Sequence, residues 1–307
     1  MDKLKVFAPA SVANVGPAFD VLGFALEGKG DVVIARKIAE PIVKISKISG
    51  DNGKLSMDAA KNTAGIAAKA VLKKINAKEG IEIELEKNLP LGSGLGSSAS
   101  SAVCGAFAAN LLFGKKLNEM ELIECCLEAE NFVSGWHADN VAPSLLGGFA
   151  LIQSYEPLNI IKLPALEKAF VSIATPAFEL PTKKAREVLP KQIELKTAVK
   201  QWGNVASLVA AIYKKDLKLF GKAIDDKIVE TARAPLIPGF FEVKKSALNA
   251  GALGCSISGA GPSIFAVSDS KKTAENVSNA MAEAFEKHSL KNVSFVSKIS
   301  KCGARKI

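Results

Sequence analysis

The sequence contains no long apolar run, and it is poor in cysteine and in large aromatic side chains. No uninterrupted apolar run reaches the roughly 18 residues that cross a bilayer, and the N-terminal stretch "MDKLKVFAPASVAN" lacks the apolar segment of a signal peptide. None of the five cysteines belongs to a C-x-x-C pair, and most lie in apolar stretches. The sequence therefore predicts buried free thiols in a reducing compartment, and a cytoplasmic protein without a membrane segment.

Nucleic-acid binding is not indicated either. The chain has 40 basic and 31 acidic residues, a net charge of +9, but no block of five basic residues. Its lysines occur in scattered pairs such as Lys73–Lys74 and Lys214–Lys215, a pattern typical of a solvated surface. Two tryptophans and two tyrosines offer few rings for stacking on bases. The mild basic excess suits a small anionic ligand equally well.

The chain length and the hydrophobic patterns predict two domains of α+β class. At about 150 residues per domain, 307 residues suggest two units, which we place at residues 1–160 and 161–307. In "GIEIELEKN" the apolar Ile81, Ile83 and Leu85 alternate with glutamates, which is the period of a half-buried strand. Strand and helix patterns occur in both halves, and this mixture favours the α+β class.

Local signals mark several helices. Asn62 precedes a helical pattern and is typical of an N-cap. Asn118 and Glu121 form an N-x-x-E variant of the capping box. The second half is mostly helical in pattern between residues 183 and 250.

The stretch "PLGSGLGSSAS", residues 90–100, follows the predicted strand and leads into a helix of small residues. A helix N-terminus exposes unpaired N–H groups and carries the positive end of the helix dipole, so it binds anions, above all phosphate. Gly92, Gly94 and Gly96 allow the backbone to curl and to approach a ligand closely. We therefore predict a phosphate-binding loop.

Two better-known phosphate loops do not fit this stretch. A P-loop needs G-x-x-x-x-G-K-[ST], and no lysine follows Gly96. The dinucleotide fingerprint is G-x-G-x-x-G, whereas the spacing here is G-x-G-x-G. A tight turn that packs small residues is the alternative for a lone G-x-G, but eleven consecutive residues of this composition favour a phosphate site.

The same stretch resembles the phosphate loop of the GHMP kinases. "SISGAGPSIFAV" resembles the third motif of that family, and "APASVANVGPAFDVLGFAL", "GWHADNVAPSLLGGF" and "TARAPLIPGF" resemble its homoserine kinase branch. The resemblance implies the two-domain GHMP kinase fold, with the active site in the cleft between the domains. It also implies ATP-dependent phosphorylation of the L-homoserine hydroxyl, a step of threonine biosynthesis. The family further implies a homodimer.

Mevalonate kinases and galactokinases carry signatures that are absent from this chain. The first have a lysine after Ala-Pro-Gly and then Gly-Glu-His, and the second have Gly-Arg-Asn near the start. Another GHMP small-alcohol kinase, such as a mevalonate-type kinase, remains the alternative within enzymes. From a different class, the chain could be an RNA-binding or regulatory protein that retains only the fold.

The resemblance implies a set of ATP contacts. They are Pro90, Leu91, Gly92, Ser93, Gly94, Leu95, Gly96, Ser97, Ser98, Ala99 and Ser100 of the loop, Gly259 and Gly261 of the C-terminal glycine turn, and Asn62, with Lys87 as a further adenine contact.

The resemblance also implies the substrate contacts. They are Asn14, Asp20, His137, Asn140, Arg186 and Arg233. The candidate catalytic residues are Asp139, Asn140 and Arg186. An amide and a carboxylate suit the hydroxyl and ammonium groups of homoserine, and arginine forks bind a carboxylate in a bidentate manner. Taken singly, each of these residues has a structural alternative, such as a turn, a surface arginine or a structural histidine.

Glu130 shares the apolar face of its predicted helix with Ile123, Cys126 and Leu127. A buried carboxylate must be paired or bind a metal, and Mg²⁺ takes one or two protein oxygens besides phosphate and water. The family suggests Mg²⁺ on Glu130 and Ser98; a glutamate that reaches out to water is the alternative. Asp139 stands where mevalonate kinases have an aspartate base, but the lysine that accompanies such a base is absent, so a protein base remains open.

Overall fold

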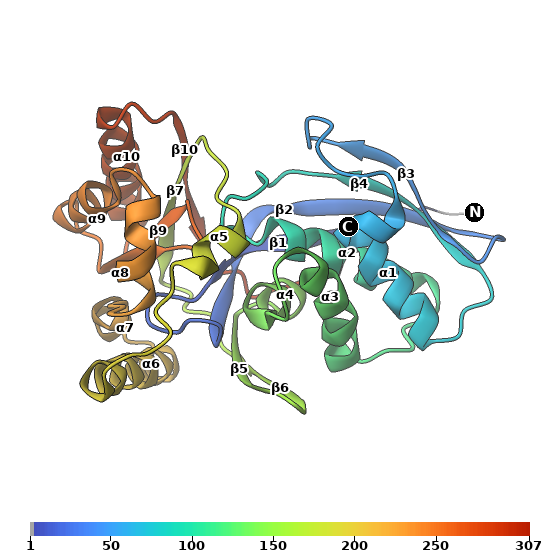
Figure 1. Cartoon of the computed structure of the whole chain (residues 1–307), viewed down its shortest axis with the longest axis horizontal. Coiled ribbons are helices and arrows are strands. Elements are labelled where there is room, and N and C mark those ends of the chain that lie inside the picture. Colours follow the sequence, from blue (N-terminus) through green and yellow to red (C-terminus); the bar gives the residue numbers. More distant parts are fainter. Residues whose placement is uncertain (1–2) are drawn as a thin grey trace.

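Two β-sheets, each covered by helices, organise the chain in the computed structural model, which describes residues 3–307 (Figure 1). The first sheet has seven strands: β1 (Leu4–Ala13), β2 (Leu22–Ile38), β3 (Val43–Ser49), β4 (Gly80–Glu86), β5 (Phe149–Tyr155), β6 (Leu158–Leu163) and β11 (Arg305–Lys306). The second has four: β7 (Phe170–Pro176), β8 (Gly254–Ile257), β9 (Ile264–Ser268) and β10 (Asn292–Lys298). The predicted mixture of strands and helices in both halves is confirmed.

The first sheet has the order β11-β1-β2-β4-β3, and β5 joins it by pairing with both β2 and β6. Only β3 and β4 run parallel, and the chain passes between them through a helix. The C-terminal strand β11 returns to pair with β1, so the C-terminus lies in the first half (Figure 1). The predicted boundary at residue 160 falls within β6, and the segment 164–169 links the two sheets.

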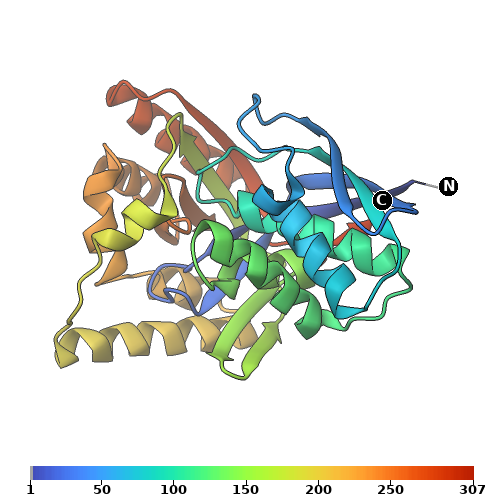
Figure 2. The same cartoon turned by 45° about the vertical axis from the view of Figure 1, so that its right-hand side comes forward.

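Four helices pack on one face of the first sheet (Figure 2). They are α1 (Thr63–Lys74), α2 (Ser97–Leu112), α3 (Glu119–Val133) and α4 (Ala138–Leu146). Helix α2 contacts the sheet and all three of the others, and its alanines, serines and Gly105 permit this close approach. A Cβ at Gly105 would lie 2.2 Å from the carbonyl oxygen of Ala64 in α1. The small-residue composition of α2 is therefore a packing requirement.

The second half carries the remaining helices. They are α5 (Thr182–Glu187), α6 (Leu195–Lys214), α7 (Leu217–Ala223), α8 (Val229–Arg233), α9 (Phe240–Asn249) and α10 (Lys271–Lys287), besides the short 3₁₀ turn η2 (Ala234–Leu236). A second 3₁₀ turn, η1 (Ala59–Lys61), precedes α1 in the first half. The expected helical stretch between residues 183 and 250 is thus confirmed as five separate helices. The second sheet is antiparallel, in the order β10-β7-β9-β8.

The two halves share one hydrophobic cluster. Phe24 and Phe149 of the first sheet lie edge to face with ring centroids 5.3 Å apart. Phe24 also meets Phe265 of the second sheet at 6.0 Å, and Phe149 meets Phe220 of α7 at 5.6 Å. All four rings are buried. Because the cluster contains side chains from both sheets, neither half completes its core alone.

The local sequence signals agree with the structure. The Asn62 side chain accepts a hydrogen bond from Ala64 N and caps α1, and Asn118 with Glu121 forms the predicted capping box of α3. Four of the five cysteines are buried, and all five are free; only Cys302 is exposed. Within residues 3–307, no helix combines the length and the apolar character required to cross a membrane.

We expect Phe149→Ala to lower the free energy of unfolding by about 3–5 kcal/mol, because it opens a cavity in the cluster that joins the sheets. Urea unfolding should still follow a single transition by both far-ultraviolet circular dichroism and tryptophan fluorescence, since the halves share that core. The exposed Phe132, replaced by alanine, serves as the control and should change the stability by less than about 0.5 kcal/mol. Separate transitions for the two probes in the wild type would contradict the shared core.

Candidate active site

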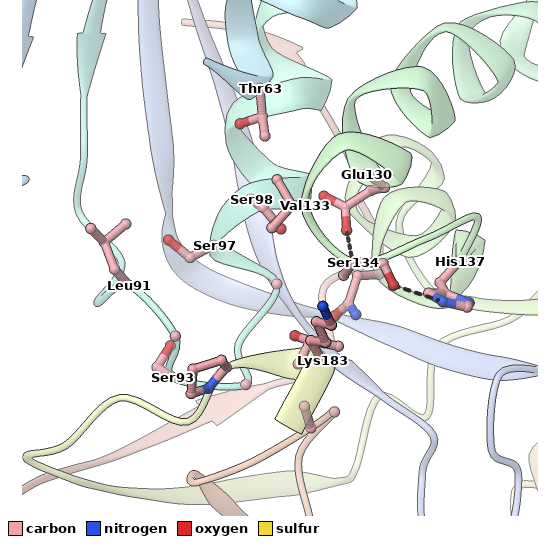
Figure 3. Close-up of a pocket in the computed structure, with 18 of the residues that line it drawn as sticks. Thr63, Leu91, Ser93, Ser97, Ser98, Glu130, Val133, Ser134, His137 and Lys183 are labelled. Atoms are coloured by element: carbon pink, nitrogen blue, oxygen red, sulfur yellow. Dashed lines mark hydrogen bonds between the residues drawn. The ribbon is translucent and has the colours of Figure 1, made fainter. Parts of the chain in front are cut away.

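The predicted glycine loop and the predicted substrate residues line one pocket between the two halves (Figure 3). The first half contributes the connection between β1 and β2, Lys87 just after β4, the N-termini of α1, α2 and α4, and the C-terminal end of α3. The second half contributes α5, α8 and the glycine turn before β9. Polar side chains that line the pocket are Asn14, Asp20, Lys61, Asn62, Thr63, Lys87, Ser93, Ser97, Ser98, Ser101, Glu130, Ser134, His137, Asp139, Asn140, Thr182, Lys183, Arg186 and Arg233.

All three loop glycines have positive φ angles, 59° at Gly92, 81° at Gly94 and 66° at Gly96. L-residues rarely adopt these angles. A Cβ at Gly94 would also lie 2.4 Å from Ser258 O, and one at Gly96 would lie 2.2 Å from Ser11 Oγ. The loop therefore requires glycine for its conformation and for its close contacts.

The C-terminal glycine turn supports the loop from the second half. Ser258 Oγ donates to Gly94 O at 2.7 Å, and Ser263 N donates to Ser93 O at 3.0 Å. Gly259, which also has a positive φ, lines the pocket next to the loop. Two glycine motifs more than 150 residues apart in the sequence thus form one wall of the site.

Helix α2 begins at Ser97 directly after Gly96, and no side chain caps its N-terminus. Its first N–H groups and the positive end of its dipole therefore face the pocket, as the phosphate-loop prediction requires. Ser97 and Ser98 line the pocket. Pro90, Leu95, Ala99, Ser100 and Gly261 do not: Leu95 and Ala99 are buried in the core, and Ser100 Oγ donates to the Ala8 carbonyl.

Asn62 lines the pocket and caps α1, and its neighbour Thr63 lies away from Lys183 of the second half (Figure 3). The Asn62 amide donates to Ser56 O at 3.1 Å while its oxygen accepts from Ala64 N at 3.1 Å. Thr63, Leu55 and Val133 line the same part of the pocket.

Lys87 follows β4 and has a role that its sequence position did not reveal. Its ammonium group is buried beneath the first turn of α2 and forms an ion pair with the buried Asp31. It also donates to Ser97 O and Ser97 Oγ at 2.8 Å and to Ser101 Oγ at 2.9 Å. The ammonium group is fully used in holding this turn, so the structure gives it a supporting role beneath the loop instead of the predicted adenine contact.

Glu130 projects from the last turn of α3 toward Ser98 on α2 (Figure 3). It is buried, as the pattern predicted, and Oε2 accepts a 3.4 Å hydrogen bond from Ser134 Oγ. Burial raises its pKa to about 7, although the Ser98 and Ser134 hydroxyls act in the opposite direction. Oε1 is buried without a hydrogen-bond partner among the described residues. A buried carboxylate oxygen without a partner is a candidate metal ligand.

Asp139 lies in the first turn of α4 and is also buried. Burial, with a smaller contribution from the nearby Asp20, raises its pKa to about 7. It can therefore exchange a proton near neutral pH. The adjacent Asn140 accepts a hydrogen bond from Ser11 Oγ at 2.9 Å and lies against Gly96 of the loop.

Asp20, Arg186 and His137 form a charged group opposite the loop. Arg186 Nη2 donates to Asp20 Oδ1 at 2.7 Å, while Arg186 Nε is buried without a partner among the described residues. His137 Nδ1 lies 3.7 Å from Asp20 Oδ2, and its Nε2 is 3.1 Å from Ser134 O (Figure 3). Burial lowers the pKa of His137 despite the neighbouring Asp20 carboxylate. The three residues come from three separate segments and meet only in the fold.

Arg233 is the largest fully buried side chain of the described residues, with 2% of its surface exposed. Nε donates to Ala185 O at 2.9 Å and Nη1 to Gly259 O at 3.0 Å. Within residues 3–307 it forms no salt bridge, and burial followed by the nearby Arg186 lowers its pKa to about 10. A buried guanidinium without a carboxylate partner, next to a second guanidinium, is well suited to an anionic ligand.

Asn14 begins a loop of unusual backbone conformation. Asn14, Val15 and Gly16 all have positive φ, and so does Asp20. A β-branched residue such as Val15 is rarely found in this region, and such strain is frequent at functional sites. The Asn14 side chain stabilises the loop, since Nδ2 donates to Gly259 O at 2.8 Å and Oδ1 accepts from Asp20 N at 3.1 Å.

Sequence reasoning missed Phe19, Ser134, Thr182 and Lys183, which also line the pocket. Lys183 reaches in from α5, on the opposite side from Glu130 (Figure 3). Pocket residues of this kind carry no motif of their own. Phe19 and Lys183 could have been suspected only because they neighbour Asp20 and Arg186 in the sequence.

Comparison with known proteins identifies the fold. Residues 62–148 match the GHMP kinases N terminal domain, and residues 208–287 match the GHMP kinases C terminal domain. The chain is 48% identical to a homoserine kinase from Chlorobium phaeobacteroides, over 99% of each chain. It is 48% identical to a homoserine kinase from Arabidopsis thaliana, over 98% of this chain and 84% of that protein. A crystal structure of homoserine kinase from Cytophaga hutchinsonii superposes with a TM-score of 0.96 at 49% identity, covering 100% of this chain and 98% of that one.

We expect Asp139→Asn to stabilise the protein more at high pH than at low pH. In the folded state the pKa of Asp139 is about 7, against an ordinary value of 3.8. Between these values the folded state binds more protons than the unfolded state, so the free energy of unfolding falls as the pH rises. Asparagine removes this dependence, so the Tm gain of the variant should grow between about pH 4 and pH 8.

Thermal unfolding followed by circular dichroism across this range measures the effect. Glu128→Gln is the matched control, because Glu128 is an exposed acid on α3, and its Tm difference should stay constant with pH. A Tm difference for Asp139→Asn that is the same at all pH values would contradict the raised pKa.

Proposed function

This chain belongs to the homoserine kinases of the GHMP kinase family, and we propose that it transfers the γ-phosphoryl group of ATP to the hydroxyl of L-homoserine, giving O-phospho-L-homoserine for threonine biosynthesis. One observation carries the proposal: an uncapped glycine loop at a helix N-terminus faces two guanidinium groups across a single pocket. The loop suits a phosphate chain, and the guanidinium groups suit the carboxylate of a small amino acid. The high identity to homoserine kinases favours this reading over a mevalonate-type kinase.

In this proposal the triphosphate lies along the loop from Gly92 to Ser98. The free N–H groups of α2 and the positive end of its dipole bind the phosphate oxygens without a loop lysine. The adenine ring lies toward the part of the pocket formed by Leu55, Thr63 and Val133, near the predicted Asn62. The support for this direction is that Leu55 and Val133 offer apolar surface for the ring and that the neighbouring Thr63 lies away from Lys183 (Figure 3).

The amino acid then occupies the end of the pocket beside the second half. Its carboxylate binds Arg233, which has no acidic partner of its own among residues 3–307, and Arg186. Its ammonium group binds Asp20, and His137 and Asn14 complete the pocket around it. Arg186 and Asp20 are already paired at 2.7 Å, so a zwitterion inserts between two opposite charges that neutralise each other in its absence.

Glu130 and Ser98 fit the predicted Mg²⁺ site. Glu130 Oε1 is buried and unpartnered in the described structure, and the Ser98 hydroxyl lies opposite on α2. When bound, Mg²⁺ neutralises charge on the β- and γ-phosphates. Glu130 must be ionised to act as a ligand, and with its pKa at about 7 this requirement falls in the neutral range.

Phosphoryl transfer depends mainly on alignment and on charge neutralisation, since its transition state is loose. The arginines and Asp20 hold homoserine so that its hydroxyl points to the loop, and Asn140 lies between the substrate end and Gly96. Asp139, with a pKa of about 7 and a place in the pocket, is able to accept the hydroxyl proton. A loose transition state requires little proton transfer before the new bond forms, so we assign Asp139 an auxiliary role.

We further propose that the two predicted units correspond to the two sheets, apart from the end of β6 and the C-terminal strand β11, which belong to the first sheet. We also propose that the protein acts as a cytoplasmic homodimer without nucleic-acid or membrane partners. The buried free thiols support a reducing compartment. The scattered lysines support the absence of a nucleic-acid partner. The dimer rests on the family resemblance alone.

We expect ADP formation that depends on Mg²⁺ and on L-homoserine, at least about tenfold faster in kcat/KM than with L-serine, mevalonate or galactose. L-serine is one methylene shorter and fails to reach the loop, and galactose has no carboxylate for the buried Arg233. Mevalonate has a carboxylate but no ammonium group, so it leaves Asp20 without its ligand. An unpaired buried polar group costs enough free energy for such discrimination. A coupled assay for ADP with each alcohol measures this. Equal turnover of mevalonate would contradict the assignment.

We expect Glu130→Gln to fold normally and to lose at least about 100-fold in kcat, the effect of removing one electrostatic contact in a transition state. Excess Mg²⁺ should restore part of the loss. Asp139→Asn should lose about tenfold or less, because the reaction needs little help from a base. The measurement is kcat against Mg²⁺ concentration for both variants. A nearly inactive Asp139→Asn beside an active Glu130→Gln would instead support a protein base.

A further inference from the structure

Phe19 lies next to both arginines of the pocket. The centre of its ring is 5.0 Å from the Arg186 guanidinium carbon and 5.1 Å from that of Arg233, and both groups lie over the ring. An aromatic face attracts a cation at this distance, more strongly where water is excluded. A single ring therefore contacts the two guanidinium groups that come from α5 and α8.

Packing of the core does not explain this ring. Phe19 is half-buried and belongs to none of the three hydrophobic clusters of the described residues. It lines the active-site pocket on one side and, on another, a separate apolar pocket near Trp202 and Ile193. A ring between two pockets has fewer apolar neighbours than a core residue. The two guanidinium groups are therefore a large part of what the Phe19 ring contacts.

The backbone holds the ring in place. Phe19 lies in the strained loop between Asn14 and Asp20, whose ends are joined by the hydrogen bond from Asp20 N to Asn14 Oδ1. The middle of the loop is fixed by Gln201 of α6, whose Nε2 donates to Pro17 O at 2.8 Å. The loop is thus anchored to the second half, which also carries both arginines.

The Phe19 ring offsets the repulsion between the two arginines of the site. Burial and then the nearby Arg186 lower the pKa of Arg233, and the effect of Arg186 reflects repulsion between the two like charges. Of the two arginines, only Arg186 forms an ion pair with Asp20. Asp20, Asp139 and Asp226 act on the pKa of Arg233 in the opposite direction, but none of them forms a salt bridge with it among residues 3–307. A carboxylate placed between the arginines would remove the repulsion but would also occupy the substrate position. An aromatic face stabilises both cations and leaves that position open.

We propose that Phe19 is a positioning residue, which holds Arg186 and Arg233 together as one carboxylate-binding pair and so determines the preference for substrates that carry a carboxylate. This inference rests on the proposed function. It predicts that the loss of the ring affects recognition of the carboxylate and leaves the nucleotide end of the pocket unchanged.

The test compares L-homoserine with 3-aminopropan-1-ol, which has the same ammonium and hydroxyl groups but no carboxylate. Phe19→Leu should raise the KM for homoserine about tenfold, the size of one partly desolvated cation–π interaction, with little change in kcat. The KM for ATP and the kcat/KM for 3-aminopropan-1-ol should each change less than about twofold. Phe19→Tyr, which keeps the aromatic face, should restore the KM for homoserine.

Phe113→Leu is the matched control. Phe113 is also half-buried and lies under a cation, with Lys37 Nζ 4.4 Å from its ring centre, but it is outside the pocket. Its substitution should leave all kinetic constants unchanged. An equal loss of kcat/KM on both substrates in Phe19→Leu, or no loss on homoserine, would overturn the inference while the proposed function stands. A wild-type protein that phosphorylates neither compound would overturn both.

Discussion

The buried ion pair between Asp31 and Lys87 is the interaction on which the rest of the site depends. Asp31 Oδ1 accepts from Asn88 N and Leu89 N, while Oδ2 accepts from Lys87 and from Ser101 Oγ, so the carboxylate is fully bonded. Removing one partner of such a pair leaves an uncompensated buried charge, which costs about 3–5 kcal/mol. The pair joins β2, the end of β4 and the first turn of α2, and it thereby fixes the direction in which the glycine loop leaves the sheet.

The active site requires that both halves be held together. The glycine turn before β9 donates two hydrogen bonds to the loop, and Asn14 and Arg233 both donate to Gly259 O in that turn. One turn therefore links the phosphate end of the pocket to the substrate end. The shared phenylalanine cluster fixes the relative position of the two sheets, on which these short hydrogen bonds depend. A shift of about 1 Å between the halves would separate the loop from its support, and displacements of this size are costly for catalysis.

The sequence predicted those parts of the fold that depend on local pattern. Period-two alternation identified β4, the asparagine caps identified the starts of α1 and α3, and the apolar face of α3 placed Glu130 inside. No lysine follows Gly96, and the sequence suggested Lys87 only as an adenine contact, not as the lysine that supports the loop from beneath. Lys87 acquires its role only through Asp31, which is 56 residues away, and only the pairing of β2 with β4 brings the two together. Phe19 and the unpaired state of Arg233 depend likewise on tertiary contacts.

The charged groups of the site are buried at a cost in free energy. Glu130 and Asp139 are buried acids whose pKa is raised to about 7, and Arg233 is a buried base whose pKa is lowered to about 10. Each shift means that the charged form is less stable here than in water. The fold meets this cost through its shared core and its hydrogen-bonded loops. A bound ligand of complementary charge lowers this free-energy cost. Its attraction to these groups is also stronger than it would be in water, because burial screens the charges less. These charges suit the phosphate chain and the small zwitterion of the proposed reaction, and the stability of the surrounding fold keeps them in position.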